Sequence, residues 1–191
     1  DFCLSRGLGD VYKRQDIINI EPARQKDWLR SDISLVQAKV DNIRFKETKQ
    51  KEPQLDIHYT IESSQYGNKT GKRLFIPVNI FHKGFYSPSN QGERTQDIQI
   101  NYGYLDIDSL NIRLPEGYEI ESLPKTTDME TKFGKFHSSI TLEEGGNILI
   151  VHRLLFHQGN YPKEDNTDFM DFRKNVATQY AAKIIVKKSG E

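Results

Sequence analysis

The residue best suited to nucleophilic chemistry in this chain is Cys3, the only cysteine among 191 residues. Cysteine attacks through its thiolate, and a nearby imidazole raises the thiolate fraction. The chain offers five histidines for that role: His58, His82, His137, His152 and His157. Those at positions 58, 137 and 152 stand among apolar neighbours in strand-like segments. A packed, structural histidine is therefore the favoured interpretation of each of these three.

A metal site is not indicated by the same residues. His152 and His157 are five positions apart, so on one strand they would face opposite sides of the sheet. No Cys/His cluster has zinc-ligand spacing, and a single cysteine cannot form an internal disulfide. We expect no metal and no cofactor.

The pair Asp106 and Asp108 in "YLDIDSL" could suggest acid–base chemistry between two carboxylates. Two like charges at a spacing of two lie on the same face of a strand. Such a pair more often marks a solvated face or a strand end, and this is the interpretation we favour.

Aromatic residues gather around the long polar segment 82–97, "HKGFYSPSNQGERTQD". They could form a platform for a sugar or a peptide, with Phe85 and Tyr86 as the candidate binding residues. Packing in the core and at sheet edges is the favoured alternative for the whole group, which is Phe81, Phe85, Tyr86, Tyr102 and Tyr104.

The composition excludes several classes of partner. Lys plus Arg and Asp plus Glu number 27 each, so no net charge attracts nucleic acid or an anionic membrane. No apolar run approaches the length of roughly 18 residues that a transmembrane helix needs. An apolar fraction of 36% suits sheets with one solvated face.

The pattern along the chain is mainly that of strands. Leu55, Ile57, Tyr59 and Ile61 alternate cleanly, and the preceding strand shifts phase before Ile43, as a β-bulge would cause. A polar "KQKEP" between them predicts a hairpin, and "GG" at 145–146 predicts another. Around "PARQKDWL" we expect a helical turn.

Near the C-terminus the spacing of apolar residues changes from that of a strand to that of a helix. Between positions 165 and 182, apolar residues at spacings of three and four form the stripe of an amphipathic helix: Phe169, Phe172, Val176 and Tyr180. About eight strands at intervals near ten residues precede or follow it. We therefore predict a mainly β protein, an antiparallel β-sandwich with one C-terminal amphipathic helix.

The opening stretch "CLSRGLGDVYKRQ" differs in character from "DIINIEPARQKDWL" after it, and it resembles translated sequencing adapter. The resemblance implies that residues 1–15 are a non-native leader and that Cys3 is absent from the natural protein. We assign 16–52 to an N-terminal segment with a strand that belongs to the same domain, and 53–191 to a β-sandwich domain.

Most of 53–188 resembles a known family, the C-terminal β-domain of unknown function that follows a transglutaminase-like core in bacterial proteins. Five pieces in order carry the resemblance: "GKRLFIPVNIF", "DIDSLNIRLPEGYEIESLP", "TKFGKF", "VHRLLFHQGNYPKED" and "FMDFRKNVATQYAAKIIVKK". None of the catalytic motifs of such a core can be placed on this chain, so no catalytic residue is carried over.

The resemblance implies a non-catalytic accessory domain whose parent is a cysteine hydrolase or acyl-transfer enzyme with its core upstream. It also implies an exported protein, periplasmic or extracellular. Two other functions stay open: a free-standing secreted module that binds glycan or peptide through the 82–97 loop, and an independent hydrolase.

Overall fold

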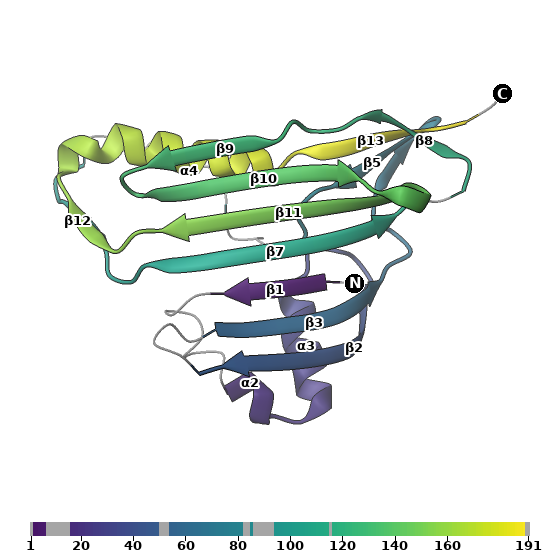
Figure 1. Ribbon diagram of the computed structural model, residues 1–191, viewed down its shortest axis with the longest axis horizontal. Helices are drawn as coiled ribbons and strands as arrows, with labels where there is room; N and C mark the ends of the chain where they lie inside the picture. The colour runs from purple at the N-terminus through teal and green to yellow at the C-terminus, as the bar shows by residue number, and fades with distance from the viewer. Residues whose placement is uncertain are drawn as a thin grey trace.

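The computed structural model describes residues 2–6, 16–49, 54–81, 85, 94–114 and 116–189 (Figure 1). Its large sheet is built from β1 (Phe2–Arg6), β2 (Lys39–Thr48), β3 (Gln54–Glu62), β7 (Tyr104–Arg113), β9 (Thr127–Thr131), β10 (Gly134–Leu142) and β11 (Asn147–Phe156). These strands follow the order β2-β3-β1-β7-β11-β10-β9, and every neighbouring pair is antiparallel.

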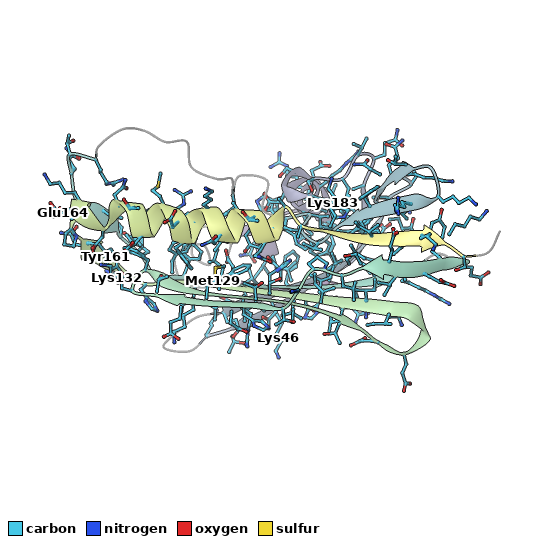
Figure 2. All side chains as sticks on the ribbon, turned by 90° about the horizontal axis from the view of Figure 1, so that it is seen from above. Lys46, Met129, Lys132, Tyr161, Glu164 and Lys183 are labelled. Atoms are coloured by element: carbon cyan, nitrogen blue, oxygen red, sulfur yellow. The ribbon has the colours of Figure 1, made fainter. Side chains whose placement is uncertain are left out.

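A second layer covers one face of this sheet. It holds the small sheet of β4 (Asn68–Thr70), β5 (Arg73–Pro77), β13 (Lys183–Lys188) and β8 (Tyr118–Ser122), in that order, and the helix α4 (Asn166–Tyr180). Figure 2 shows α4 and the small sheet end to end above the large sheet. The remaining elements are α2 (Asp16–Asn19), α3 (Pro22–Asp32), the paired short strands β6 (Ile98–Ile100) and β12 (Gly159–Tyr161), and two 3₁₀ turns (Glu144–Gly146, Lys163–Asp165).

This arrangement confirms a mainly β, antiparallel sandwich with a C-terminal helix. The described residues contain more strands than the eight or so that the pattern predicts. Strands of three residues, such as β4, β6 and β12, are too short to show a recognisable alternation. Sequence periodicity therefore detects the long strands and misses the short ones.

The two predicted hairpins are present. β2 pairs with β3, and their register shifts between Asp41 and Arg44, where Asn42 has a φ of 54°. This is the bulge that the phase shift before Ile43 indicates. The turn between β10 and β11 contains Gly145 and Gly146 at φ 75° and 77°, a conformation that costs glycine nothing and other residues more.

The stripe on α4 packs on the large sheet as predicted. Phe172, Val176 and Tyr180 are buried, and Phe169 packs beside them. They meet large-sheet residues such as Phe136 and Phe156 in an aromatic cluster under the helix. Phe156 and Phe172 have ring centroids 5.6 Å apart in an edge-to-face arrangement.

A larger apolar cluster lies under the small sheet and extends to the N-terminal helices. It includes Leu29 and Ile33 together with Ile57, Ile76 and Ile184. The predicted helical turn around "PARQKDWL" is in fact the eleven-residue helix α3, with Pro22 in its first turn. Burial of one face stabilises this helix. The helix propensity of its residues does not by itself predict its full length.

Strand β1 lies inside the large sheet, between β3 and β7. It is antiparallel to both, with Phe2 opposite Tyr59 on one side and Leu110 on the other. The segment assigned to a non-native leader thus supplies a strand to the sheet. Its backbone pairing is independent of side-chain identity, so any extended segment of similar length could make the same ladder.

Candidate functional site: the outer face of the large sheet

The residues singled out from the sequence do not gather in a single place, but two pairs of them are register partners: Cys3 with His58, and Asp108 with His152. Cys3 is the register partner of His58 on β3 and of Ser109 on β7. His137 lies on β10, His152 on β11, and His157 just after β11. His82 lies outside the described residues.

Asp106 and Asp108 are buried, with exposed fractions of 8% and 3%, which corrects the prediction of a solvated face. They share the inward face of β7 with Leu110. Apolar residues occupy both phases of β7, since Leu105 and Ile107 lie on the opposite face. The alternation of apolar and polar residues along β7 therefore does not show which face of the strand is buried in the core.

Asp108 belongs to a buried row that runs across three strands. His152 is opposite Asp108 on one side and Ser138 on the other, and all three are at most 3% exposed. A serine, a histidine and an aspartate in this order are also the residues of a catalytic triad. The hydrogen bonds of the histidine show how this row differs from one.

The geometry gives His152 a structural contact at this row. His152 Nε2 lies 3.1 Å from the carbonyl oxygen of Val78, which can only accept a hydrogen bond. Nε2 therefore carries the hydrogen and cannot take a proton. The rings of Phe136 and Tyr180 pack on the imidazole at centroid distances of 6.1 and 5.3 Å. His152 is a buried tether between the large sheet and the segment after β5.

Phe85, one of the two loop aromatics proposed to bind a ligand, is half-buried and packs against α4. Its ring meets Tyr180 edge to face at 5.5 Å, and the Arg173 guanidinium lies 5.7 Å from its centroid. These contacts use the ring in packing. Tyr86, the other candidate, lies outside the described residues.

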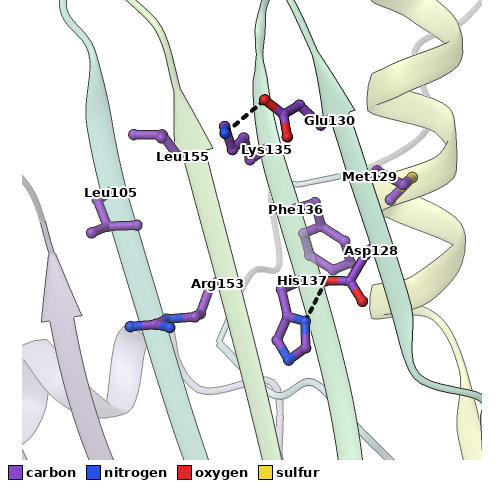
Figure 3. Close-up of a pocket in the computed structure, with 9 residues that line it drawn as sticks. All are labelled: Leu105, Asp128, Met129, Glu130, Lys135, Phe136, His137, Arg153 and Leu155. Carbon is purple, nitrogen blue, oxygen red and sulfur yellow. Dashed lines mark hydrogen bonds and ion pairs between the residues drawn. The ribbon is translucent and has the colours of Figure 1, made fainter.

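A hollow of about 370 Å³ opens on the opposite, outer face of the large sheet, away from α4 (Figure 3). Four strands, β7, β9, β10 and β11, line it. Its residues are Leu105, Asp128, Met129, Glu130, Lys135, Phe136, His137, Arg153 and Leu155. In Figure 3 Met129 and Phe136 point towards the helix side, so the outward side chains are the other seven.

Strand register arranges these outward side chains in two rows. The first row runs Glu130, Lys135, Leu155, Leu105, each opposite the next. Lys135 Nζ and Glu130 Oε1 are 2.6 Å apart. This row therefore ends in two adjacent leucines, and Leu105 is 39% exposed.

The second row runs Asp128, His137, Arg153. His137 Nδ1 lies 2.7 Å from Asp128 Oδ1. Arg153 is exposed and makes no ion pair within the described part of the chain. The hollow thus combines an apolar strip with one cation available for a carboxylate.

The outward side chains of the hollow are leucines and charged or ionisable groups. None of the nine lining residues carries a hydroxyl or thiol nucleophile. A surface that places leucines beside salt bridges is typical of a polar protein–protein contact. Sequence reasoning missed the hollow, although leucines at outward positions of β7 and β11 were the signal that could have revealed it.

Two further findings concern ligands and membranes. Among the described residues, no group of three or more His, Cys, Asp and Glu side chains could hold a metal ion. None of the helices in the described ranges is long and apolar enough to cross a membrane.

Residues 72–186 match the family described as a domain of unknown function with solved-structure structure (DUF3858). The match spans more than half of the chain, and the chain therefore belongs to this family. It runs from the start of β5 into β13 and includes the whole of the outer hollow. No curated protein and no solved structure matches the chain.

Proposed function

We propose that this chain is a non-catalytic accessory domain of an exported, transglutaminase-like bacterial protein. Three observations support the proposal: the five-piece sequence resemblance, membership of a family of unknown function over 72–186, and the structural hydrogen bond of His152 in the buried Ser138–His152–Asp108 row. The role is to pack against the catalytic core and shape access to it.

The outer hollow is a fourth supporting observation, and it is the surface that docks the core. Leu105 and Leu155 supply apolar area, and Arg153 is placed to meet a carboxylate of the core. Charged pairs at the rim set the orientation of docking and contribute little affinity.

The first experiment reads the source DNA upstream of the codon for Asp16. We expect a core with Cys, His and Asp catalytic motifs in the same reading frame. A signal peptide directly before Asp16 would overturn the proposal and favour a free-standing binding module.

The second experiment compares amide hydrogen exchange in the full-length parent and in the 191-residue chain. Docking at the hollow should slow exchange around Leu105, Lys135 and Leu155 in the parent. Substitution Leu155→Asp should remove this slowing, whereas Val36→Asp, at an exposed position outside the hollow, should not. Equal exchange in parent and fragment would reject this docking face.

A further inference from the structure

The outward face of β7 and β11 is more apolar than a solvated sheet face usually is. On β11 the even-numbered residues point inward and are buried, so the odd-numbered ones face outward, and the same holds for β7. Five of these outward residues form what we call the aliphatic strip: Leu105, Ile107, Leu149, Val151 and Leu155. Each is at least partly exposed. Uncovered apolar residues that gather on one face are typical of an interaction surface.

Arg153 lies within the aliphatic strip. It is the outward residue between Val151 and Leu155 on β11, and its register partner on β7 is Ile107. Successive outward residues of one strand are about 7 Å apart, so these aliphatic side chains border the guanidinium on three sides. Arg153 itself is exposed. The strip is thus apolar area around one cation.

The basic residues next to Arg153 already have acidic partners. Lys135 Nζ lies 2.6 Å from Glu130 Oε1, and His137 Nδ1 lies 2.7 Å from Asp128 Oδ1. Both acids belong to β9, which lies on the side of β10 away from β11. Among the described residues that line the hollow, the charge of Arg153 is therefore the one left without a partner.

This arrangement restricts what can cover the strip. A partner that buries the aliphatic side chains must also cover Arg153, because they surround it. Removing an unpaired guanidinium from water is costly, whereas a guanidinium that meets a carboxylate at the centre of an interface can stabilise the complex. Arg153 therefore discriminates against partners that bring no acid to this point.

We propose that the aliphatic strip binds an extended, acidic segment of the catalytic core, in which an Asp or Glu stands between two aliphatic residues at alternate positions. The pattern aliphatic–x–acid–x–aliphatic has the same repeat as Val151, Arg153 and Leu155, and strands of two sheets that pack face to face run nearly aligned. The carboxylate pairs with Arg153, and the aliphatic side chains cover those of the strip. That the segment belongs to the core rests on the proposed function.

The recognition is tested on the 191-residue chain with three peptides, each acetylated and amidated at its ends. Leu-Thr-Glu-Thr-Leu carries the proposed pattern. Leu-Thr-Gln-Thr-Leu replaces the carboxylate with an amide of similar shape, and Ser-Thr-Glu-Thr-Ser keeps the carboxylate without the aliphatic side chains. Shifts in the methyl NMR signals of Val151 and Leu155 report binding, and titration gives the Kd of each peptide.

We expect the first peptide to bind at least about tenfold more tightly than the other two, the discrimination usual for a hydrogen bond to a charged group. Arg153→Gln should raise the Kd of the first peptide to that of the glutamine peptide. The matched control is Arg44→Gln, which should leave the Kd unchanged. Arg44 is an exposed arginine on the same outward face, but it lies on β2 opposite His58 and outside the strip.

Equal binding of the glutamate and glutamine peptides, an unchanged Kd in Arg153→Gln, or no methyl shift with any peptide would overturn the proposal. Equal binding of the serine peptide, or an equal effect of Arg44→Gln, would also overturn it, because it would show attraction by charge alone.

Amide exchange in the parent tests the proposed function separately. Slowed exchange at Leu155 in the parent without discrimination between the peptides would reject only the recognition of the acid. Discrimination between the peptides without slowed exchange would reject the core as the occupant.

Discussion

At the scale of single residues, burial decides the role of the polar groups. His152 and His137 both lie on strands of the large sheet and look alike in the sequence. His152 is 2% exposed and donates to a backbone carbonyl of the second layer, whereas His137 stands on the outer face beside Asp128. The same residue type is thus a structural tether in one place and part of a surface hollow in the other.

The tether makes His152 sensitive to loss of its donor. Phenylalanine at this position keeps an aromatic ring but leaves the Val78 carbonyl without its bond. We expect His152→Phe to lower the free energy of unfolding by about 1–3 kcal/mol, the usual cost of an unsatisfied buried acceptor. Urea denaturation measures this change, and Tyr102→Phe, at an exposed position before β7, is the control. A loss below about 0.5 kcal/mol for His152→Phe would mean that the hydrogen bond contributes nothing.

At the scale of elements, each helix is held by a different interaction. The helix α4 is held by an apolar stripe that packs on the aromatic cluster. The helix α3 is held by its buried residue Leu29 and also by the ion pair between Lys26 and Asp41. This difference predicts different responses to mutation and to pH.

Phe172 is the centre of the α4 contact, 2% exposed and packed on Phe156. Phe172→Ala should lower the free energy of unfolding by about 3–5 kcal/mol, because it removes a fully buried aromatic side chain and leaves a cavity. Lys174→Ala, at an exposed position of the same helix, is the control and should change it by less than about 0.5 kcal/mol. A change below about 1 kcal/mol for Phe172→Ala would contradict the packing described.

Asp41 joins α3 to β2 through Lys26, at 2.7 Å, and also pairs with Lys39 at 3.1 Å. Hydrogen bonds from these two ammonium groups lower the pKa of Asp41 below its usual 3.8. A lowered pKa in the folded state stabilises the protein above pH 3.8, and this contribution is lost as the pH falls through the folded-state pKa.

Thermal unfolding at pH 7 and at pH 2.5 tests this linkage. The fall in Tm between the two should be smaller for Asp41→Asn than for the unmodified chain, because the amide cannot titrate. Asp27→Asn, on the exposed side of α3, should leave the fall unchanged. An identical pH response of Asp41→Asn and the unmodified chain would show that the ion pairs do not stabilise the fold.

At the scale of the whole molecule, the matched family region is not a self-contained core. Residues 72–186 hold β5 to most of β13, but the larger apolar cluster also takes Leu29, Val40, Ile57 and Tyr59 from outside that region. The N-terminal segments therefore contribute to the same apolar cluster as the matched region.

A chain of residues 72–189 should accordingly fold less well than the full chain. It leaves Leu110 and Ile76 without their partners on β2, β3 and α3, and it exposes an edge of β7. We expect a lower Tm and self-association in size-exclusion chromatography with light scattering. A monomer with an unchanged Tm would show that the matched region alone is the folding unit.

The sequence by itself determined the long strands, the two hairpins, the bulge near Asn42 and the stripe on α4. Each of these follows from contacts between near neighbours: period two, period 3.6, and the positive φ that Gly and Asn tolerate. Because these signals depend on neighbours in the sequence, they could be recognised without knowing which residues pack against them in the fold.

Only the tertiary structure decided which face of β7 is buried, that α3 is a full helix, and that Leu105, Leu155 and Arg153 share a hollow. It also placed the Val78 carbonyl at His152. These features join residues far apart in the chain; His152 and Val78 are separated by 74 positions. The register between strands that are distant in the chain produces no periodic pattern in the sequence. The candidate site could therefore be found only in the tertiary structure.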